Sequence, residues 1–163
     1  MSGSGTCLDV CTELGIECVS FDVAVGKDAC NPRNFTGIGT FDFIWAHPPY
    51  FRQKKYTDDP RDLSNSPTVE TFLNRFQLFI ANCAAVLERG GKFAILMGDY
   101  CDWVEGFVPF VYHTKRLCFQ NGLRQACTDI IRFSHGASSA KKVYRSSFIP
   151  GLHDVVTVVE KVT

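Results

Sequence analysis

The sequence lacks the features that mark several classes of protein. Its 163 residues carry 17 basic and 17 acidic side chains, so the net charge is about zero and nucleic-acid binding by bulk charge alone is disfavoured. No apolar run approaches the roughly 20 residues of a membrane span, and the N-terminus is too polar for a signal peptide. We therefore expect a cytoplasmic protein with no membrane partner, whose composition, 45% hydrophobic and 21% charged, is that of a globular domain.

The eight cysteines include no Cys-x-x-Cys pair, the spacing that often marks a zinc or redox site. Several of them fall within apolar periodic stretches, where a thiol behaves as a small hydrophobic side chain. We therefore predict buried, reduced thiols and no bound metal. The chain also lacks internal repeats and low-complexity tracts, and its length predicts a single domain over residues 1–163.

Helical and strand-like periods alternate along the chain. The spacing of apolar residues predicts helices over 6–14, from Ser66 to the glycines at 90 and 91, and over 107–120. The first helix has an apolar face that we expect to be buried, and in the second Ser66 is the expected N-cap and Pro67 the first helical residue. The buried face of the second helix is predicted to consist of Phe72, Phe76, Phe79, Ile80, Cys83 and Leu87. Strands are predicted at 17–23, 41–46, 92–97, 123–133 and 154–162. This alternation favours an α/β fold with a mostly parallel sheet and an antiparallel last strand.

Ligands of such sheets bind at the carboxyl ends of the strands, where three features fall. The glycine-containing segment before the first helix allows close approach of backbone to a ligand, although it could also be a linker. Asp22 ends the strand at 17–23 and can accept both hydroxyls of a ribose, unless it is a solvated loop residue. The third feature, His47-Pro48-Pro49-Tyr50, is a rigid turn with unpaired carbonyls and a flat aromatic face, unless it is merely a tight turn.

Taken in this order, the glycine segment, Asp22, “KDA” at 27–29 and “FDFIWAHPPYF” resemble the DNA amino-methyltransferases that modify adenine N6 or cytosine N4. These enzymes use S-adenosylmethionine and carry an Asp/Asn/Ser-Pro-Pro-Tyr/Phe/Trp signature. The resemblance covers nearly the whole chain and implies a Rossmann-like three-layer α/β sandwich. It implies that the target amine is held by His47, Pro48, Pro49 and Tyr50. It implies that the cofactor is bound by Ser2, Gly3, Ser4, Gly5, Thr6, Asp22, Val23, Asp28 and Ala29.

The chemistry of a base amine explains the turn. Its lone pair is conjugated with the ring, so acceptors at His47 and at the Pro48 carbonyl would take its two N–H groups and free the lone pair for direct methyl transfer. Tyr50 would stack on a base removed from its helix. No covalent nucleophile is needed, and the absence of a Pro-Cys dipeptide disfavours cytosine-C5 chemistry. His47 departs from the signature, and only a neutral imidazole can act as the acceptor.

The resemblance also implies an N-terminal truncation, because the chain begins inside the glycine segment. The strand that precedes this segment in the family would lie between the strands that end at Asp22 and His47. We expect the gap to be closed by a second copy of the chain, by another partner chain, or by direct pairing of the two strands. The alternative to an enzyme is a non-catalytic remnant, or a binding subunit that needs such a partner.

Contacts to the substrate are predicted in two polar loops, 51–66 and 136–147. The expected partner is DNA, with RNA as an alternative, and the sequence does not decide between adenine and cytosine. Few basic residues are available for phosphates, so the unaided affinity for DNA should be modest. The predicted contacts are Phe51, Tyr56, Lys141, Lys142 and Arg145, with Arg52, Lys54, Lys55 and Arg61 as further basic candidates.

Overall fold

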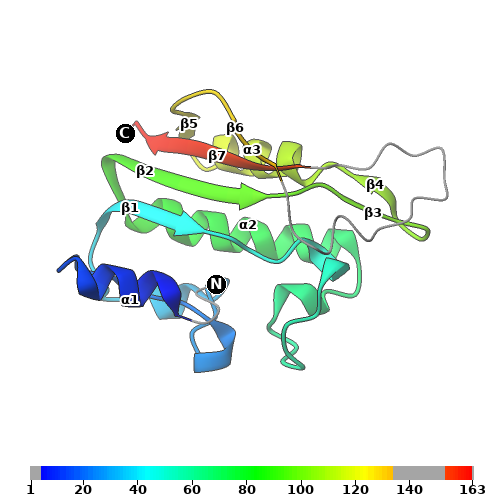
Figure 1. Cartoon of the computed structure of the whole chain (residues 1–163), viewed down its shortest axis with the longest axis horizontal. Helices are drawn as coiled ribbons and strands as arrows, with labels where there is room; N and C mark the ends of the chain where they lie inside the picture. Colours follow the sequence, from blue (N-terminus) through cyan, green and yellow to red (C-terminus); the bar gives the residue numbers. More distant parts are fainter. Residues whose placement is uncertain (1–4, 134–152, 163) are drawn as a thin grey trace.

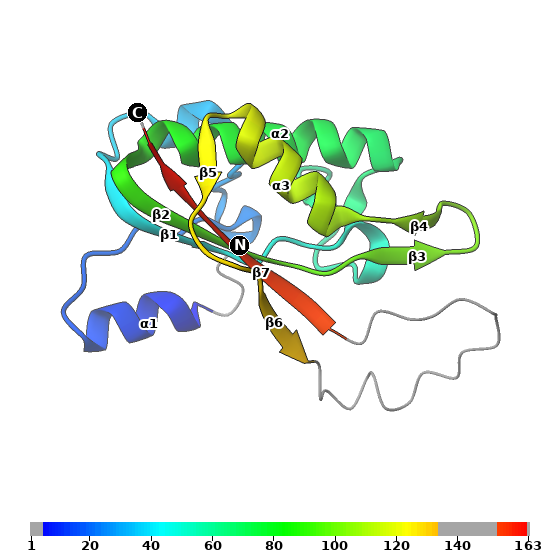
Figure 2. The same cartoon turned by 90° about the horizontal axis from the view of Figure 1, so that it is seen from above.

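The protein is built on one mixed β-sheet with helices on both of its sides (Figures 1 and 2). The computed structural model describes residues 5–133 and 153–162. The strand order is β1-β2-β7-β5, and β6 also pairs with β7. Strands β1 and β2 are parallel, whereas β7 is antiparallel to β2, β5 and β6, so among the strands that the structure describes only β7 runs against the common direction. The strands are β1 (Phe41–Ala46), β2 (Leu87–Met97), β5 (Leu123–Gln125), β6 (Ile130–Phe133) and β7 (His153–Lys161). The predicted fold class, a mostly parallel α/β sheet with an antiparallel last strand, is confirmed.

Helices cover the two sides of the sheet unequally. Helices α2 (Val69–Val86) and α3 (Phe110–Gln120) lie together on one side, and α1 (Thr6–Glu13) lies on the other side, beyond β1 (Figure 2). No residue of α1 is buried, whereas α2 buries a continuous apolar face. The main core therefore lies between the sheet and the α2–α3 layer.

This core is largely aromatic. The predicted burial is confirmed, since the six residues are at most 4% exposed, but Leu87 is the first residue of β2 and only the other five lie on α2. The rings of Phe72, Phe76 and Phe79 stack in sequence along the helix, with centroids 5.6 and 5.7 Å apart. Phe79 meets Phe93 of β2 edge to face at 5.9 Å, which joins the helix to the sheet.

Several predicted boundaries were wrong, each for a local reason. Helix α2 begins at Val69, and its N-cap is Thr68, whose hydroxyl accepts the N–H of Thr71 at 3.1 Å. Ser66 instead donates its hydroxyl to the Leu63 carbonyl at 2.8 Å and closes the short 3₁₀ turn η4 (Leu63–Asn65). The helix is followed at once by β2, which was predicted to start five residues later. A hairpin was not predicted at all: β3 (Tyr100–Asp102) and β4 (Gly106–Val108), after which α3 begins three residues later than expected.

The largest correction concerns residues 17–23. The structure shows no strand there, although the composition is strand-like, because a strand exists only through hydrogen-bonded neighbours and this segment pairs with none among the described residues. Direct pairing of this segment with β1 is therefore excluded. The burial predicted for the apolar face of α1 was also wrong: Val10 and Leu14 are 46% and 67% exposed.

The cysteines only partly follow the prediction. All eight lie within the described residues and are free thiols. Cys30, Cys83 and Cys118 are buried as expected, whereas the thiols at 7, 101 and 127 are exposed. In the described part of the chain, no helix combines the length and the apolar character that crossing a membrane requires.

Candidate functional site

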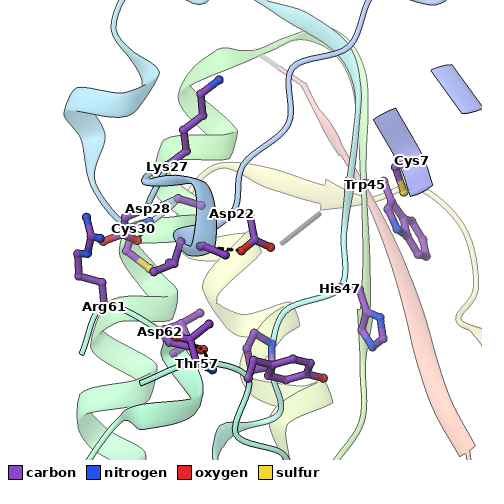
Figure 3. A pocket seen from close by; sticks show the side chains of 16 residues that line it. Cys7, Asp22, Lys27, Asp28, Cys30, Trp45, His47, Thr57, Arg61 and Asp62 are labelled. Carbon is purple, nitrogen blue, oxygen red and sulfur yellow. Dashed lines mark hydrogen bonds between the residues drawn. The ribbon is translucent and has the colours of Figure 1, made fainter. Parts of the chain in front are cut away.

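A cavity of about 430 Å³ opens beside the carboxyl end of β1 (Figure 3). Four stretches of chain surround it: α1, the segment 22–30, the end of β1 with the turn that follows, and the segment 56–63. Its size is within the range of small-molecule sites. The lining residues are Cys7, Asp22, Val23, Ala24, Lys27, Asp28, Ala29, Cys30, Trp45, His47, Pro49, Tyr56, Thr57, Arg61, Asp62 and Leu63. The structure thus brings together two groups predicted from the sequence, the acidic segment after residue 21 and the proline turn.

Asp22 is fixed at the start of a tight turn. Its carboxylate Oδ1 accepts the N–H of Ala24 at 2.9 Å and so caps the 3₁₀ turn η1 (Val23–Val25). Its own carbonyl accepts the N–H of Lys27 at 3.0 Å, which closes the loop. The cap therefore fixes the Asp22 carboxylate on the wall of the cavity.

Asp28 and Ala29 lie deeper, against α2. The Asp28 carboxylate accepts the N–H of Cys30 at 2.8 Å and lies 3.9 Å from Arg75 of α2. The carbonyl of Ala29 accepts the side-chain amide of Asn82, also of α2, at 3.0 Å. These contacts anchor the inner wall of the cavity to the core, and both predicted residues line it.

The turn after β1 presents His47 and Pro49 to the cavity, whereas Tyr50 does not line it. Nε2 of His47 lies 3.0 Å from the hydroxyl oxygen of Tyr50, and the two rings are tilted, with centroids 5.5 Å apart. Pro48 is buried. The prolines fix the backbone of the turn, so His47 and Tyr50 are held as a pair.

Tyr50 rests on Gly98, which directly follows β2. A Cβ atom added at Gly98 would lie 2.8 Å from Cε2 of Tyr50 and 2.7 Å from Oδ1 of Asp154. Burial, first, and the negative charge of Asp154, second, raise the pKa of Tyr50 well above its ordinary value. Partial burial and the nearby Arg132 lower the pKa of His47, against an opposing effect of Asp154. Both effects favour the neutral form of His47, which an acceptor requires.

Phe51, predicted to contact the substrate, belongs to the core instead. Its side chain has no exposed surface and meets Phe72, Tyr100 and Phe110 with ring centroids 5.9, 5.3 and 6.4 Å away. Its φ of +53° makes it the sole non-glycine residue with positive φ in the described part of the chain. The turn thus places the Phe51 ring in the core, and this packing holds the adjacent His47–Tyr50 pair in place.

The basic side chains of loop 51–66 are mostly engaged within the protein. Arg52 donates to the carbonyls of Ser66 and Pro67. Lys55 forms an ion pair with Asp58 at 2.5 Å. Arg61 makes a two-pronged contact with Asp59, with hydrogen bonds of 3.0 and 2.7 Å. These residues therefore stabilise the loop, and any use in phosphate binding would compete with the contacts they already make.

Tyr56 is the loop residue best placed for a ligand. It lines the cavity and is 56% exposed, with the Lys54 ammonium 5.0 Å from its ring centroid. Buried Asp62 fixes this part of the loop by accepting the N–H and the hydroxyl of Thr57, both at 3.1 Å. The exposed Tyr56 ring is therefore carried on an ordered segment.

The remaining predicted site residues fall into two groups. Gly5 has a left-handed φ of +87° and caps α1, with Thr6 as the first helical residue; neither lines the cavity. Ser2, Gly3, Ser4, Lys141, Lys142 and Arg145 lie outside the described residues.

Sequence reasoning missed several residues of the site. Cys30 and Trp45 line the cavity, and Gly98, Arg132 and Asp154 surround the His47–Tyr50 pair. Of these residues, Trp45 alone could have been predicted from the sequence, because it is the last aromatic residue before the proline turn. Burial raises the pKa of the Cys30 thiol to about 12, so this cysteine is not a thiolate nucleophile. Within the described residues, no three His, Cys, Asp or Glu side chains gather as a metal site requires.

The fold of this chain is shared with solved structures of DNA methylases. A protein of Thermus thermophilus assigned as a DNA modification methylase aligns with a TM-score of 0.58 and 18% identity, over 82% of this chain and 51% of that one. A second structure of that methylase, in complex with S-adenosyl-L-methionine, aligns with a TM-score of 0.56 and 16% identity over 82% and 53% of the two chains. The PvuII DNA methyltransferase, which is cytosine-N4-specific, gives a TM-score of 0.53 and 14% identity over 79% and 46%.

The chain thus spans about half the length of these solved structures. No family model and no curated protein matches the sequence. At such identities the likeness establishes the fold alone.

Proposed function

We propose that the chain is an S-adenosylmethionine-dependent N-methyltransferase that acts on an exocyclic amine of a DNA base, with residues 1–163 forming one methyltransferase-like domain. The observation that carries the proposal is the position of the His-Pro-Pro-Tyr turn. It ends β1 at the carboxyl edge of the sheet and shares one cavity with Asp22. The carboxylate that would bind the cofactor, Asp22, and the imidazole that would accept the target amine, His47, therefore line the same cavity of a methyltransferase fold.

The residues of the cavity fit the cofactor. Asp22 would accept the ribose hydroxyls from its position as the cap of η1, on the wall of the cavity. The half-buried Val23 and the buried Ala29 supply apolar surface for a flat adenine, and the Asp28 side chain is fixed beside them. When bound, the cofactor supplies an electrophilic methyl group.

The turn would hold the target amine. Neutral His47 would accept one N–H and the Pro48 carbonyl the other, which localises the lone pair of the amine toward the methyl donor. The pairing of Tyr50 with His47 changes the expected stacking role: the Tyr50 hydroxyl orients His47, and its ring can contact a base only beside the cavity. The exposed ring of Tyr56 is a second stacking surface, on the cavity itself.

A second candidate is a binding subunit whose site is completed by a partner chain, with a second copy of this chain as the simplest case. The outer edge of β1 favours it. Among the described residues β1 pairs with β2 alone, and its side chains Phe43 and Trp45 are 55% and 44% exposed. An apolar edge strand of this kind is a template for pairing with another chain.

The test is methyl transfer from labelled S-adenosylmethionine to duplex DNA that lacks adenine and cytosine methylation, followed by chromatography of the nucleosides. The proposal expects N6-methyladenine or N4-methylcytosine, with RNA as the comparison substrate. Tyr50→Ala should remove the product and leave cofactor affinity within a few-fold, whereas the exposed Tyr112→Ala on α3 is the matched control. If the wild-type chain forms no methylated product at any protein concentration, the binding subunit would be the better explanation.

A further inference from the structure

Three polar side chains form a line that leads from the cavity into the sheet. His47 stands at the cavity, and its Nε2 lies 3.0 Å from the hydroxyl oxygen of Tyr50. The Tyr50 ring and the Asp154 carboxylate both crowd the space above Gly98, since a Cβ placed there would meet both. Arg132 of β6 lies 3.6 Å from Oδ2 of Asp154. Residues from the β1 turn, from β7 and from β6 therefore meet at one point.

The direction of the hydrogen bonds follows from the number of protons. Tyr50 has a single hydroxyl proton. It can give this proton to His47, whose Nε2 lies at 3.0 Å, or to the carboxylate of Asp154, which lies with the Tyr50 ring above Gly98 and contributes to the raised pKa of Tyr50. A carboxylate is the stronger acceptor, because a charge-assisted O–H···O⁻ bond is about twice as strong as a neutral one. The Tyr50 oxygen is then left to accept, and the group that can donate to it is the Nε2–H of His47.

We propose that Asp154 is a positioning residue that acts through Tyr50 to hold the proton of His47 on Nε2 and its lone pair on Nδ1. This inference rests on the proposed function, in which Nδ1 accepts an N–H of the target amine. Hydrogen-bond partners for Nδ1 are absent from the described part of the chain. The opposite tautomer would set an N–H of His47 against an N–H of the substrate, and the acceptor would be lost.

The charges around His47 support this arrangement. Arg132 and Asp154 face it from β6 and β7 with opposite effects on its pKa, and the Arg132 effect adds to that of burial. Asp22, Lys27, Arg61, Asp62 and Tyr56 are the other ionisable groups that line the cavity with it, together with the thiols of Cys7 and Cys30 and the carboxylate of Asp28. Removal of the Asp154 charge should therefore lower the pKa of His47 and also allow both tautomers of His47 to be populated.

The tautomer can be read directly by NMR of the ¹⁵N-histidine-labelled chain at pH 8, with His47→Gln to assign the signal. The inference expects the proton on Nε2 in the wild-type chain. In Asp154→Asn, which keeps the shape of the side chain, we expect a mixture of tautomers and a lower titration midpoint. Asp129→Asn is the matched control. It removes a carboxylate near the sheet that pairs with Lys115 at 2.5 Å, and it should change neither the tautomer nor the titration midpoint of His47.

Kinetics supply the second readout. Asp154→Asn should lower kcat roughly 10–100-fold and change cofactor affinity less than twofold. In a Tyr50→Phe background the same substitution should have less than a twofold effect, because the connection is already broken. A proton on Nδ1 in the wild-type spectrum would overturn the inference, whether or not the variants fold. So would an Asp154→Asn spectrum identical to the wild-type one. Absence of methyl transfer by the wild-type chain would instead overturn the proposed function and leave the tautomer result standing.

Discussion

Replacement of Gly98 by alanine tests the geometry of the site with a single methyl group. The backbone of Gly98 is not in the left-handed region, so alanine is compatible with it, and the whole effect comes from crowding. The new Cβ would lie 2.7 Å from Oδ1 of Asp154 and 2.8 Å from Cε2 of Tyr50, whereas ordinary contact begins at 3.4 Å. The two side chains must therefore withdraw by about 0.7 and 0.6 Å.

The consequence falls on the His47–Tyr50 contact. A withdrawal of this size along the 3.0 Å hydrogen bond would take it beyond bonding distance. A misplacement of about 1 Å in a catalytic arrangement costs about 100-fold in rate. We therefore expect Gly98→Ala to lower kcat by about 10–100-fold, with cofactor affinity within twofold. Overpacking costs about 1–3 kcal/mol of stability, and the lower entropy of the unfolded alanine chain returns about 0.4–1 kcal/mol.

Gly91, in the N-terminal half of β2, provides the matched control. A Cβ there would lie 2.9 Å from the Glu88 carbonyl and 3.1 Å from that of Asp42, so Gly91→Ala crowds the sheet without touching the site. Methyl transfer to DNA and urea unfolding, measured on both variants, separate the two effects. Equal stability losses with full activity in Gly98→Ala would refute the argument, because the site would then tolerate displacement of Tyr50.

Three further predictions concern other parts of the molecule. Because the pKa of His47 is lowered from 6.5, methyl transfer should decline at low pH with a midpoint below 6.5; His47→Asp should remove this decline, and a midpoint above 6.5 in the pH–rate profile would contradict the acceptor role. Phe51→Ala should cost about 3–5 kcal/mol in urea unfolding; a cost below about 1 kcal/mol would show that Phe51 is not a core anchor. Light scattering should show a dimer that Phe43→Lys converts to a monomer with unchanged cofactor affinity; a wild-type monomer that binds cofactor equally well would exclude pairing through β1.

The sequence predicted those elements that carry their own physical signature. The apolar face of α2 is periodic over its whole length, and Phe41–Ala46 is apolar and ends at two prolines, so both were located correctly. The predictions for residues 17–23 and for the apolar face of α1 were wrong for a common reason. Their structure depends on what lies beside them, and local composition contains no information about a neighbour.

The site was predictable to a similar extent. Asp22 and His47 were both predicted to lie at strand ends, and the structure places them on one cavity although no strand forms at 17–23. Phe51 was misassigned because “PPYF” places two aromatic residues in sequence, and only the positive φ at Phe51 decides which of them turns into the core. Asp154 could not be linked to Tyr50, because their contact depends on the register of β7 beside β2 and on the absence of a side chain at Gly98.

The most direct test of the central claim is isothermal titration of the chain with S-adenosylmethionine and with its demethylated product. We expect micromolar binding and a loss of at least tenfold in Asp22→Ala, since a hydrogen bond to a charged group contributes about 1.5–3 kcal/mol. Asp22 also caps η1, so Asn31→Ala, which removes the cap of the neighbouring turn η2 (Pro32–Phe35) outside the cavity, is the control and should bind normally. No measurable binding to the wild-type chain, or equal binding by Asp22→Ala, would contradict the assignment of this cavity as the cofactor site.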